Sequence, residues 1–344
     1  MNKRKKIYVG ISAGDPSGVG IEVIFKTFLD NRMMDFCTPI IFGSQKIILH
    51  HKKILGFSDL HINIIKNINA VKEKKINLLD NSKYDVDINI GTSSSYSGKY
   101  AIESIEQACD AIQKNKIDLL VTAPINKLAI QENIKTFIGH TEFLEKMFSG
   151  QSLMLMCSEI MKIGFVTGHT SLKNVTKSIN TQKIIKKTKQ LNNCLIQDFG
   201  VRKPKIAVLG INPHAGEEGM LGTEEKETII PAINDLNESG IMAFGPYPAD
   251  SFFIIEKLKA FDGVLAMYHD QGLIPFKTFS FEDGVNYTAG LNIIRTSPVH
   301  GTAYNIAGHG KANENSFRQA IFLACDIFKK RKEYDSINLH ALKN

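Results

Sequence analysis

The chain has 344 residues, and its 43% hydrophobic and 22% charged content is ordinary for a globular protein that folds in water. Its apolar runs fall short of the roughly 18–20 residues that a membrane-spanning helix needs, so we expect no membrane protein. The net charge is +7, but the lysines are dispersed among isoleucines and asparagines and are not interleaved with aromatic residues. We therefore expect no nucleic-acid partner and only a mild attraction for phosphorylated small molecules.

The N-terminal stretch and the cysteines predict a cytoplasmic location. Residues 1–11 open with basic side chains like a signal peptide, but the apolar part is too short and runs straight into Gly14–Gly20. The cysteines show no pairing or CxxC pattern, which is typical of reduced thiols. They are Cys37, Cys109, Cys157, Cys194 and Cys325.

Strand and helix patterns alternate along the whole chain, which is typical of an α/β protein with mainly parallel strands. The length allows a large core and two lobes. In chain order, the pattern predicts a strand at Ile7–Ile11, a helix at Ile21–Leu29, a strand at Thr38–Phe42, a helix at Gln45–Leu55, a strand at Ile62–Ile65, a helix at Ser97–Lys114, a strand at Lys116–Thr122, a strand pair at Leu153–Cys157 and Lys162–Thr167, a helix at Thr181–Phe199, a strand at Lys205–Gly210, a helix at Thr223–Ser239, a strand at Phe261–Met267 and a helix at Asn313–Lys330. The polar stretch Val71–Asn89 is weakly patterned and is interpreted as an exposed excursion.

Three histidines each follow a predicted strand: His169, His214 and His269. The carboxyl ends of parallel strands meet at one edge of a sheet, so these imidazoles could converge there. Three imidazoles suit a divalent ion such as zinc and leave one coordination position for a substrate. The alternative is three loop histidines that are satisfied by hydrogen bonds. The strand before His269 also delivers Asp270 to the same edge.

Other polar residues lie in turns and loops. His140 and Thr141 precede an amphipathic stretch, where Thr141 either caps a helix or binds, with His140, an oxygen-rich ligand. Asp250 precedes a predicted helix and is interpreted as an N-cap or as a catalytic acid. The glycine-bearing loop 212–225 carries two acidic pairs, which favours hydrogen bonding to metal ligands or a hinge over phosphate binding.

Lys277, Asn286 and Arg295 recur at intervals of nine residues. Lysine supplies a point charge and arginine a planar fork, a pair suited to a phosphate monoester. Glycines and prolines punctuate the segments that carry the three residues, so we expect none of them on a helix face. Phosphate binding and ordinary surface positions both remain open on pattern alone.

Together, these motifs resemble the 4-hydroxythreonine-4-phosphate dehydrogenase family of vitamin B6 biosynthesis. The similarity runs from the first predicted strand to the closing helix, and Tyr268-His-Asp-Gln-Gly272 is its most specific part. One departure is Thr167-Gly-His-Thr-Ser-Leu172, where a Thr-His-Ile-Pro-Leu-like run is expected. The stretches that carry the resemblance are Gly14–Gly20, Thr122–Lys127, Gly139–Phe143, Asn212–Gly216, Ala249–Asp250, Tyr268–Gly272 and Arg295–Ala303.

The resemblance implies the two-lobed α/β fold of the isocitrate and isopropylmalate dehydrogenases, with an active-site cleft between the lobes and no Rossmann motif. We expect residues 1–128 and 275–344 to form the first lobe, on the cofactor side. Residues 129–274 would form the second lobe, with the metal histidines and the dimer interface. A homodimer is implied, in which the partner subunit contributes one ligand to a shared active site.

By the same resemblance, His169, His214 and His269 are metal ligands for zinc, magnesium or cobalt. The implied substrate-binding residues are His140, Thr141, Lys277, Asn286 and Arg295. Asp250 and Asp270 are candidates for the catalytic base. The cofactor is NAD or NADP; its contacts are unknown, and Gly301–Asn313 is the region in which we expect them.

The implied reaction is the oxidation of 4-(phosphooxy)-L-threonine to 2-amino-3-oxo-4-(phosphooxy)butanoate, which loses CO₂ to give 3-amino-2-oxopropyl phosphate. The alternative enzyme oxidises and decarboxylates D-threonate or D-erythronate 4-phosphate. An alternative of another class is a metal-dependent sugar-phosphate binding protein without chemistry.

Overall fold

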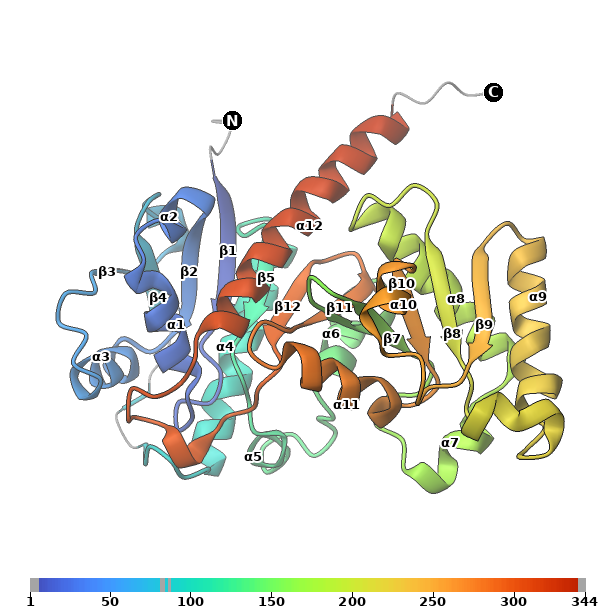
Figure 1. Cartoon of the computed structure of the whole chain (residues 1–344). Helices are drawn as coiled ribbons and strands as arrows, with labels where there is room; N and C mark the ends of the chain where they lie inside the picture. Colours follow the sequence, from blue (N-terminus) through green and yellow to red (C-terminus); the bar gives the residue numbers. More distant parts are fainter. Residues whose placement is uncertain (1–5, 81–83, 86–87, 340–344) are drawn as a thin grey trace. The chain divides into compact units, whose positions relative to one another are not determined.

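A computed structural model describes residues 6–80, 84–85 and 88–339 of the chain (Figure 1). The Cα positions divide the chain into two compact units. The first unit is Met1–Gly150 with Leu291–Phe328, and the second is Gln151–Gly290 with Lys329–Asn344. The lobe boundaries after residues 128 and 274 stay a prediction; these units change over at residues 150 and 290.

The first unit is built on six strands in the order β3-β4-β2-β1-β5-β12. Every strand pairing resolved within it is parallel. This order differs from the 3-2-1-4-5-6 order of a Rossmann fold, as predicted. The bounds are β1 Ile7–Ser12, β2 Cys37–Gly43, β3 Ile62–Ile65, β4 Ile76–Asp80, β5 Leu119–Thr122 and β12 Arg295–Pro298.

The helices of the first unit follow the predicted pattern closely. The helix α4 begins with a capping box. The Ser94 hydroxyl accepts a hydrogen bond from the Ser97 backbone nitrogen, and the Ser97 hydroxyl accepts one from the Ser94 backbone nitrogen. Its buried face, which includes Tyr100 and Ile105, packs on β1, β2 and β5. The bounds are α1 Gly20–Leu29, α2 Met33–Phe36, α3 Gln45–Ile54, α4 Ser95–Gln113, α5 Lys127–Gln131 and α6 His140–Met147, with short 3₁₀ turns at Ile68–Ala70 and Tyr304–Ile306. The long α12 Asn315–Leu339 belongs to this unit as far as Phe328, and its remaining residues belong to the second unit.

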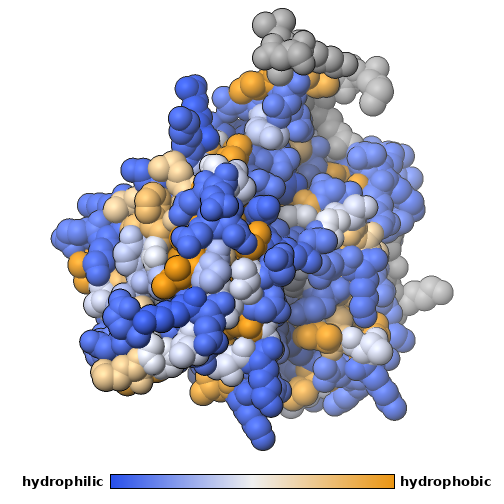
Figure 2. Space-filling view, turned by 90° about the vertical axis from the view of Figure 1, so that its right-hand side faces the viewer, coloured by the Kyte–Doolittle hydropathy of each residue, from blue (hydrophilic) through white to orange (hydrophobic). Residues whose placement is uncertain are grey.

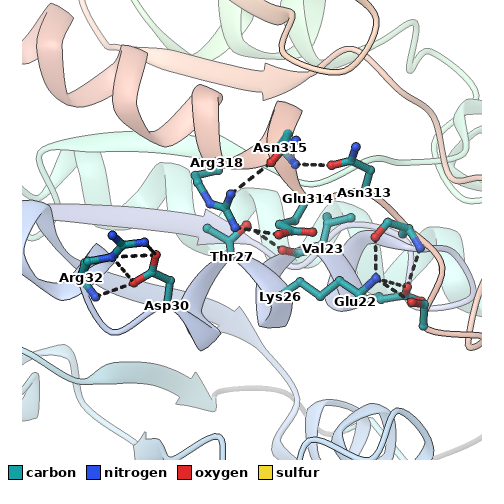
Figure 3. A network of polar contacts seen from close by, with 12 residues as sticks. Glu22, Val23, Lys26, Thr27, Asp30, Arg32, Asn313, Glu314, Asn315 and Arg318 are labelled. Atoms are coloured by element: carbon teal, nitrogen blue, oxygen red, sulfur yellow. Dashed lines mark hydrogen bonds and ion pairs between the residues drawn. The ribbon is translucent and has the colours of Figure 1, made fainter.

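The helix α1 holds the segment that leads into α12 through a polar network (Figure 3). The ammonium group of Lys26 donates to the carbonyl oxygens of Gly310 at 2.7 Å and Ala312 at 2.6 Å. The buried carboxylate of Glu22 accepts from the backbone nitrogen of Ala312 at 2.8 Å and lies 3.4 Å from Lys26 Nζ. These bonds fix the backbone of the segment directly, without any need for a packed side chain.

The second unit has six strands in the order β11-β6-β7-β10-β8-β9. The predicted pair β6 and β7 is antiparallel, whereas β7-β10-β8-β9 pair in parallel. The bounds are β6 Gly150–Cys157, β7 Lys162–Phe165, β8 Lys205–Leu209, β9 Met242–Tyr247, β10 Gly263–Ala266 and β11 Val285–Leu291.

Helices pack on this second sheet, with α8 and α11 both contacting β7 and β10. Inside the unit, the buried carboxylate of Asp198 accepts from the Tyr287 hydroxyl at 2.7 Å and from Arg331 Nε at 2.6 Å. A buried charge is tolerated because each oxygen has a partner. The bounds are α7 Leu172–Ser178, α8 Thr181–Gln197, α9 Ile230–Glu238 with a preceding π turn at Glu225–Ile229, α10 Ile255–Lys259 and α11 His269–Ser280.

The interpretation of the weakly patterned segment as an exposed excursion was wrong. Within Val71–Asn89, the residues Ile76–Asp80 form a fully buried strand, β4, between β2 and β3. Its second residue, Asn77, is tolerated in the core because its amide donates to the carbonyl oxygens of Lys72 and Lys75 at 3.0 and 2.8 Å. Because a hydrogen-bonded asparagine occupies a core position, the strand lacks the continuous apolar pattern by which a buried strand is recognised. Residues 81–83 and 86–87 of the same stretch lie outside the described residues.

The surface carries the charges that composition predicts. The face shown in Figure 2 is largely hydrophilic, with hydrophobic residues in small separate areas. Among the described residues, none of the helices has the length and apolar character needed to cross a membrane.

Candidate functional site

The predicted site residues fall into two groups, one in each unit, and the three histidines of the second unit follow the carboxyl ends of strands. In the second unit, β7, β10 and β8 are adjacent parallel strands, and each leads into one of the three histidines. His169 follows β7, His214 follows β8 and His269 begins α11 after β10. The prediction that neighbouring strands carry these residues to the same edge is therefore confirmed at the level of topology.

The structure brings two of the histidines together. The ring centroids of His169 and His269 are 5.8 Å apart. His269 Nδ1 lies 2.6 Å from Asp270 Oδ1, which leaves Nε2 as the ring nitrogen available to a ligand. A carboxylate on the second nitrogen is the usual partner of a metal-binding histidine, because it fixes the tautomer and the ring orientation. Asp270 is thus placed to orient His269.

His214 lies exposed on the loop that follows β8, in left-handed backbone conformation with φ of 51°. Within the described ranges, no three His, Cys, Asp or Glu side chains form a group that could hold a metal ion. A single chain therefore presents a pair of histidines, with His214 on a neighbouring loop. Two imidazoles with a carboxylate partner are a donor set that fits zinc or cobalt better than magnesium, which prefers oxygen ligands.

In the first unit, Arg295 is the first residue of β12 and is 2% exposed. Its Nε and Nη2 donate to the Thr122 hydroxyl, at 3.0 and 2.5 Å, from the end of the neighbouring strand β5. Burial lowers the pKa of Arg295 to about 9, so the guanidinium still carries its charge at neutral pH. A buried cation at a strand end is a strong candidate for binding an anion.

His140 lies beside this arginine and begins α6. Its Nε2 is buried and has no hydrogen-bond partner among the described residues. Burial, followed by the positive charges of Arg295 and Lys127, holds the pKa of His140 well below its usual 6.5. The ring is therefore neutral near pH 7 and can donate or accept one hydrogen bond from a ligand.

The same helix corrects one prediction. Thr141 does not cap α6, because Gly139 occupies the N-cap position and Thr141 lies in the first turn. Glu142 lies in that turn, as predicted. Both Thr141 and His140 are thereby placed near the positive end of a helix dipole, where an anion is favoured.

Lys277 and Asn286 belong to the second unit. The expectation that Lys277 lies off any helix face was wrong, because α11 continues through Pro275 and Lys277 lies in its last turns. Its side chain is exposed. Asn286 lies on β11, and its side-chain oxygen is buried without a hydrogen-bond partner in the described part of the chain. An orphaned buried amide oxygen is costly unless a ligand or water satisfies it.

Asp250 is exposed in the turn after β9. The N-cap interpretation was wrong, because Ile254 occupies the N-cap of α10.

The segment Gly301–Asn313, where cofactor contacts are expected, is fastened to the turn after β1. Asp15 in that turn is fully buried, and its carboxylate accepts from the Tyr304 hydroxyl at 2.7 Å and the Ser97 hydroxyl at 3.3 Å. Burial raises the pKa of Asp15 above its usual 3.8. The glycine-rich stretches Gly14–Gly20 and Gly301–Asn313 therefore form one structured region of the first unit.

Sequence reasoning missed several residues around these groups. Thr122 and Lys127 were noted only as parts of a motif, and Glu225 and Gln271 only as members of a loop and a strand end. The available signal was their position at a strand end, in the turn that follows a strand end, or in an acidic pair that opens a helix. Their contacts, however, depend on neighbours that are far away in sequence.

Comparison with known proteins gives a consistent picture. The family model described as pyridoxal phosphate biosynthetic protein PdxA matches residues 35–324. A 4-hydroxythreonine-4-phosphate dehydrogenase of Bacteroides thetaiotaomicron is 43% identical over 99% of this chain and 94% of its own length. A Clostridium botulinum protein that carries the name of a D-threonate 4-phosphate dehydrogenase is 35% identical over 95% of this chain and 99% of its own length.

Solved structures agree with the fold. The crystal structure of 4-hydroxythreonine-4-phosphate dehydrogenase from Klebsiella pneumoniae is similar with a TM-score of 0.82 and 31% identity, covering 95% of this chain and 99% of that one. A terephthalate 1,2-cis-dihydrodiol dehydrogenase from Burkholderia xenovorans LB400 shares the fold, with a TM-score of 0.61 and 22% identity over 94% of this chain and 98% of that one. The predicted α/β class outside the Rossmann fold is thereby confirmed.

Proposed function

The chain belongs to the PdxA family of pyridoxal phosphate biosynthetic proteins, and on this premise we propose that it is a 4-hydroxythreonine-4-phosphate dehydrogenase. The C3 alcohol of 4-(phosphooxy)-L-threonine loses a hydride to NAD⁺ or NADP⁺ and a proton to a base. The product, 2-amino-3-oxo-4-(phosphooxy)butanoate, then loses CO₂ to give 3-amino-2-oxopropyl phosphate. This oxidation belongs to vitamin B6 biosynthesis.

The observation that carries the proposal is the buried cation of the first unit. Arg295, anchored by Thr122, lies near enough to the neutral ring of His140 to influence its pKa, and the buried Nε2 of that ring has no partner in the described ranges. A buried arginine is retained at a cost in desolvation, which an anionic ligand offsets. Together with Thr141, these residues would hold an anionic or polar group of the substrate. Lys277 and Asn286 of the second unit would hold the remaining polar groups.

The paired histidines support a divalent cation as part of the machinery. His169 and His269 would bind it, with Asp270 orienting His269 and with His214 completing the set. When bound, a zinc or cobalt ion supplies Lewis acidity to oxygen atoms of the substrate. A histidine binds a metal ion through a ring nitrogen that carries no proton, and the carboxylate of Asp270 on Nδ1 would make Nε2 that nitrogen in His269.

The proton that leaves the alcohol requires a base, for which Asp250 and Asp270 are the candidates. Asp270 already bonds to His269, so its part is to orient that ring. Asp250 is exposed and free to approach a substrate, which makes it the first choice for a base. We also propose a homodimer with a shared active site. The nicotinamide cofactor would bind to the first unit, near Gly301–Asn313. The unpaired cysteines, all buried, are compatible with a cytoplasmic location.

The decisive test is the formation of reduced nicotinamide, followed at about 340 nm, from 4-(phosphooxy)-L-threonine with NAD⁺ and NADP⁺ in turn. We expect turnover that a chelator abolishes and zinc or cobalt restores. Full activity after complete removal of divalent metal would contradict the metal assignment. Absence of turnover with every phosphorylated acid would instead favour a binding protein without chemistry.

A second substrate class is favoured by one observation, the similarity to the Clostridium botulinum relative. D-threonate 4-phosphate and D-erythronate 4-phosphate lack the amino group but keep the phosphate and the neighbouring alcohol. Comparison of kcat/KM for these acids with that for the amino acid substrate decides between the two. We expect the amino acid to be preferred, and a higher kcat/KM for either hydroxy acid would replace the proposal.

A further inference from the structure

The loop that carries His214 has an unusual backbone. Five consecutive residues, 214–218, have positive φ, between 42° and 84°, and only Gly216 among them is a glycine. A left-handed conformation costs about 1–2 kcal/mol for each residue with a side chain. Such a conformation persists only where the surrounding structure enforces it. Something other than local preference must therefore hold this loop in place.

A buried carboxylate provides part of that restraint. Glu225, 2% exposed, accepts through Oε1 from the backbone nitrogens of Ile211 at 2.7 Å and Asn212 at 2.8 Å. Its Oε2 accepts from the side-chain nitrogen of Asn212 at 2.9 Å. A Cβ added at Gly216 would lie 2.7 Å from the same Oε2, so the loop closes tightly over the carboxylate. Glu225 thus fixes the entry to the loop by hydrogen bonds and packs closely against Gly216 inside it.

A buried amide ties the entry of this loop to the strand end that carries His269. Gln271 Oε1 accepts from the backbone nitrogen of Met267 at 2.7 Å, and its Nε2 donates to the carbonyl oxygen of Gly210 at 2.6 Å. Because one partner is a donor and the other an acceptor, only one orientation of the amide satisfies both. Met267 lies two residues before His269, and Gly210 lies four residues before His214.

From these contacts we propose that Gln271 and Glu225 are positioning residues for the metal ligands. Gln271 sets the separation between the backbone before His214 and the backbone before His269. Glu225 holds the entry of the strained His214 loop in a fixed position relative to β8. Neither side chain is itself proposed as a metal ligand. The inference rests on the proposed function, and it holds whichever subunit completes the ligand set, because both loops belong to one unit of one chain. Residues that orient ligands typically change metal affinity by about 10–100-fold when altered.

The test measures Zn²⁺ affinity of the full-length protein by competition with a chromophoric chelator. Gln271→Glu keeps the shape and the bond from Met267 but places a carboxylate oxygen against the Gly210 carbonyl. Glu225→Gln keeps the shape but places an amide against the Asn212 side chain. We expect each substitution to weaken Zn²⁺ binding by about 10–100-fold. We also expect both to alter the visible spectrum of the Co²⁺-loaded protein at saturation, which a general loss of stability would not do.

Two matched variants serve as controls. Gln190→Glu makes the same change at an amide that donates to the Gln151 carbonyl at 2.8 Å in the same unit. Glu224→Gln replaces the neighbouring carboxylate, whose Oε2 accepts from the Asn212 side chain at 2.7 Å, with an uncharged amide. We expect both controls to bind Zn²⁺ within about threefold of the wild type.

The outcomes separate the two proposals. If the wild type binds Zn²⁺ and Gln271→Glu and Glu225→Gln bind it equally well, with unchanged Co²⁺ spectra, the positioning role is overturned while the metal site stands. If the wild type oxidises its substrate but binds no Zn²⁺ or Co²⁺, the metal assignment fails and takes this inference with it. If His269→Ala loses the metal and Gln271→Glu weakens it, both are supported.

Discussion

The two groups of site residues are held in opposite ways. In the first unit, Arg295 is itself buried in a strand, and its charge is kept in a dry environment beside the neutral ring of His140. In the second unit, His169 and His214 are exposed on loops, and buried polar side chains hold the backbone that carries the second of them. A charge that must attract an anion gains strength from burial, because the local dielectric is low. A metal ligand must instead reach outward, so its rigidity has to come from the backbone beneath it.

The strongest way to test this contrast is to remove a proposed metal ligand of the second unit. His269→Ala should lower kcat/KM by about 10³-fold or more, because several kcal/mol of transition-state stabilisation depend on the cation. The thermal midpoint should change little, since His269 is only half-buried. Activity assays and a thermal melt in the presence of excess chelator check both statements. A loss of activity matched by a loss of folded structure would show that the second group is structural.

The buried cation should respond differently. Arg295→Met should lower kcat/KM for the phosphorylated substrate by roughly 100-fold, because a buried charge contact with an anion is worth about 2–5 kcal/mol. The KM for the nicotinamide cofactor should stay unchanged. The control is Arg32→Ala, which removes an arginine exposed to solvent and bonded to Asp30 at 2.6 Å. Equal kinetic constants for the wild type and Arg295→Met would remove this residue from the binding site.

Asp198 is a buried charge with no proposed role in binding or catalysis, so it offers a sharper comparison with Arg295. Asp198→Asn leaves Arg331 without its carboxylate partner inside the second unit. Breaking a buried ion pair costs about 3–5 kcal/mol, so unfolding by urea should shift accordingly while kcat at saturating substrate is kept. Tyr287→Phe removes the hydroxyl that donates to Asp198 and accepts from Arg331 Nη2 at 2.8 Å, and should cost about 1 kcal/mol for each of these two bonds. If Asp198→Asn changed catalysis and left stability intact, the network would belong to the site.

The smallest predicted effect is a pH dependence of stability in the first unit. His51 is buried on α3, its Nε2 lies 2.7 Å from the Pro16 carbonyl oxygen, and burial lowers its pKa to about 4. The unfolded chain, with a histidine pKa of about 6.5, binds a proton below that pH, whereas the folded chain does so only near pH 4. Stability contributed by His51 is therefore lost as pH falls from about 6.5 towards 4, by about 1.4 kcal/mol at pH 5.5.

His51→Gln keeps a donor near the Pro16 carbonyl but cannot titrate. Urea unfolding of wild type and variant at pH 7.5 and pH 5.5 should therefore show that the difference between them shrinks by about 1.4 kcal/mol at the lower pH. Since all other titrating groups are common to both proteins, their contributions cancel. An unchanged difference would mean that His51 is protonated in the folded protein.

The sequence by itself determined the alternation of strands and helices, and it placed the three histidines correctly after β7, β8 and β10. Periodicity and the position of a residue after a strand are local properties, so one chain is enough to read them. The family resemblance added the reaction. Local reasoning was wrong where a polar residue lies in a core strand, as with Asn77 in β4, or where a helix continues through a proline, as with Pro275 before Lys277.

Only the tertiary structure decided which side chains are buried, which pair, and what holds them. The contact between Arg295 and Thr122 joins residues 173 positions apart, and the one between Gln271 and Gly210 spans 61. Such contacts depend on strand order, which no local pattern encodes. The burial that sets the charge state of His140 and the restraint on the His214 loop follow from that order, because desolvation and hydrogen bonding act between neighbours in space.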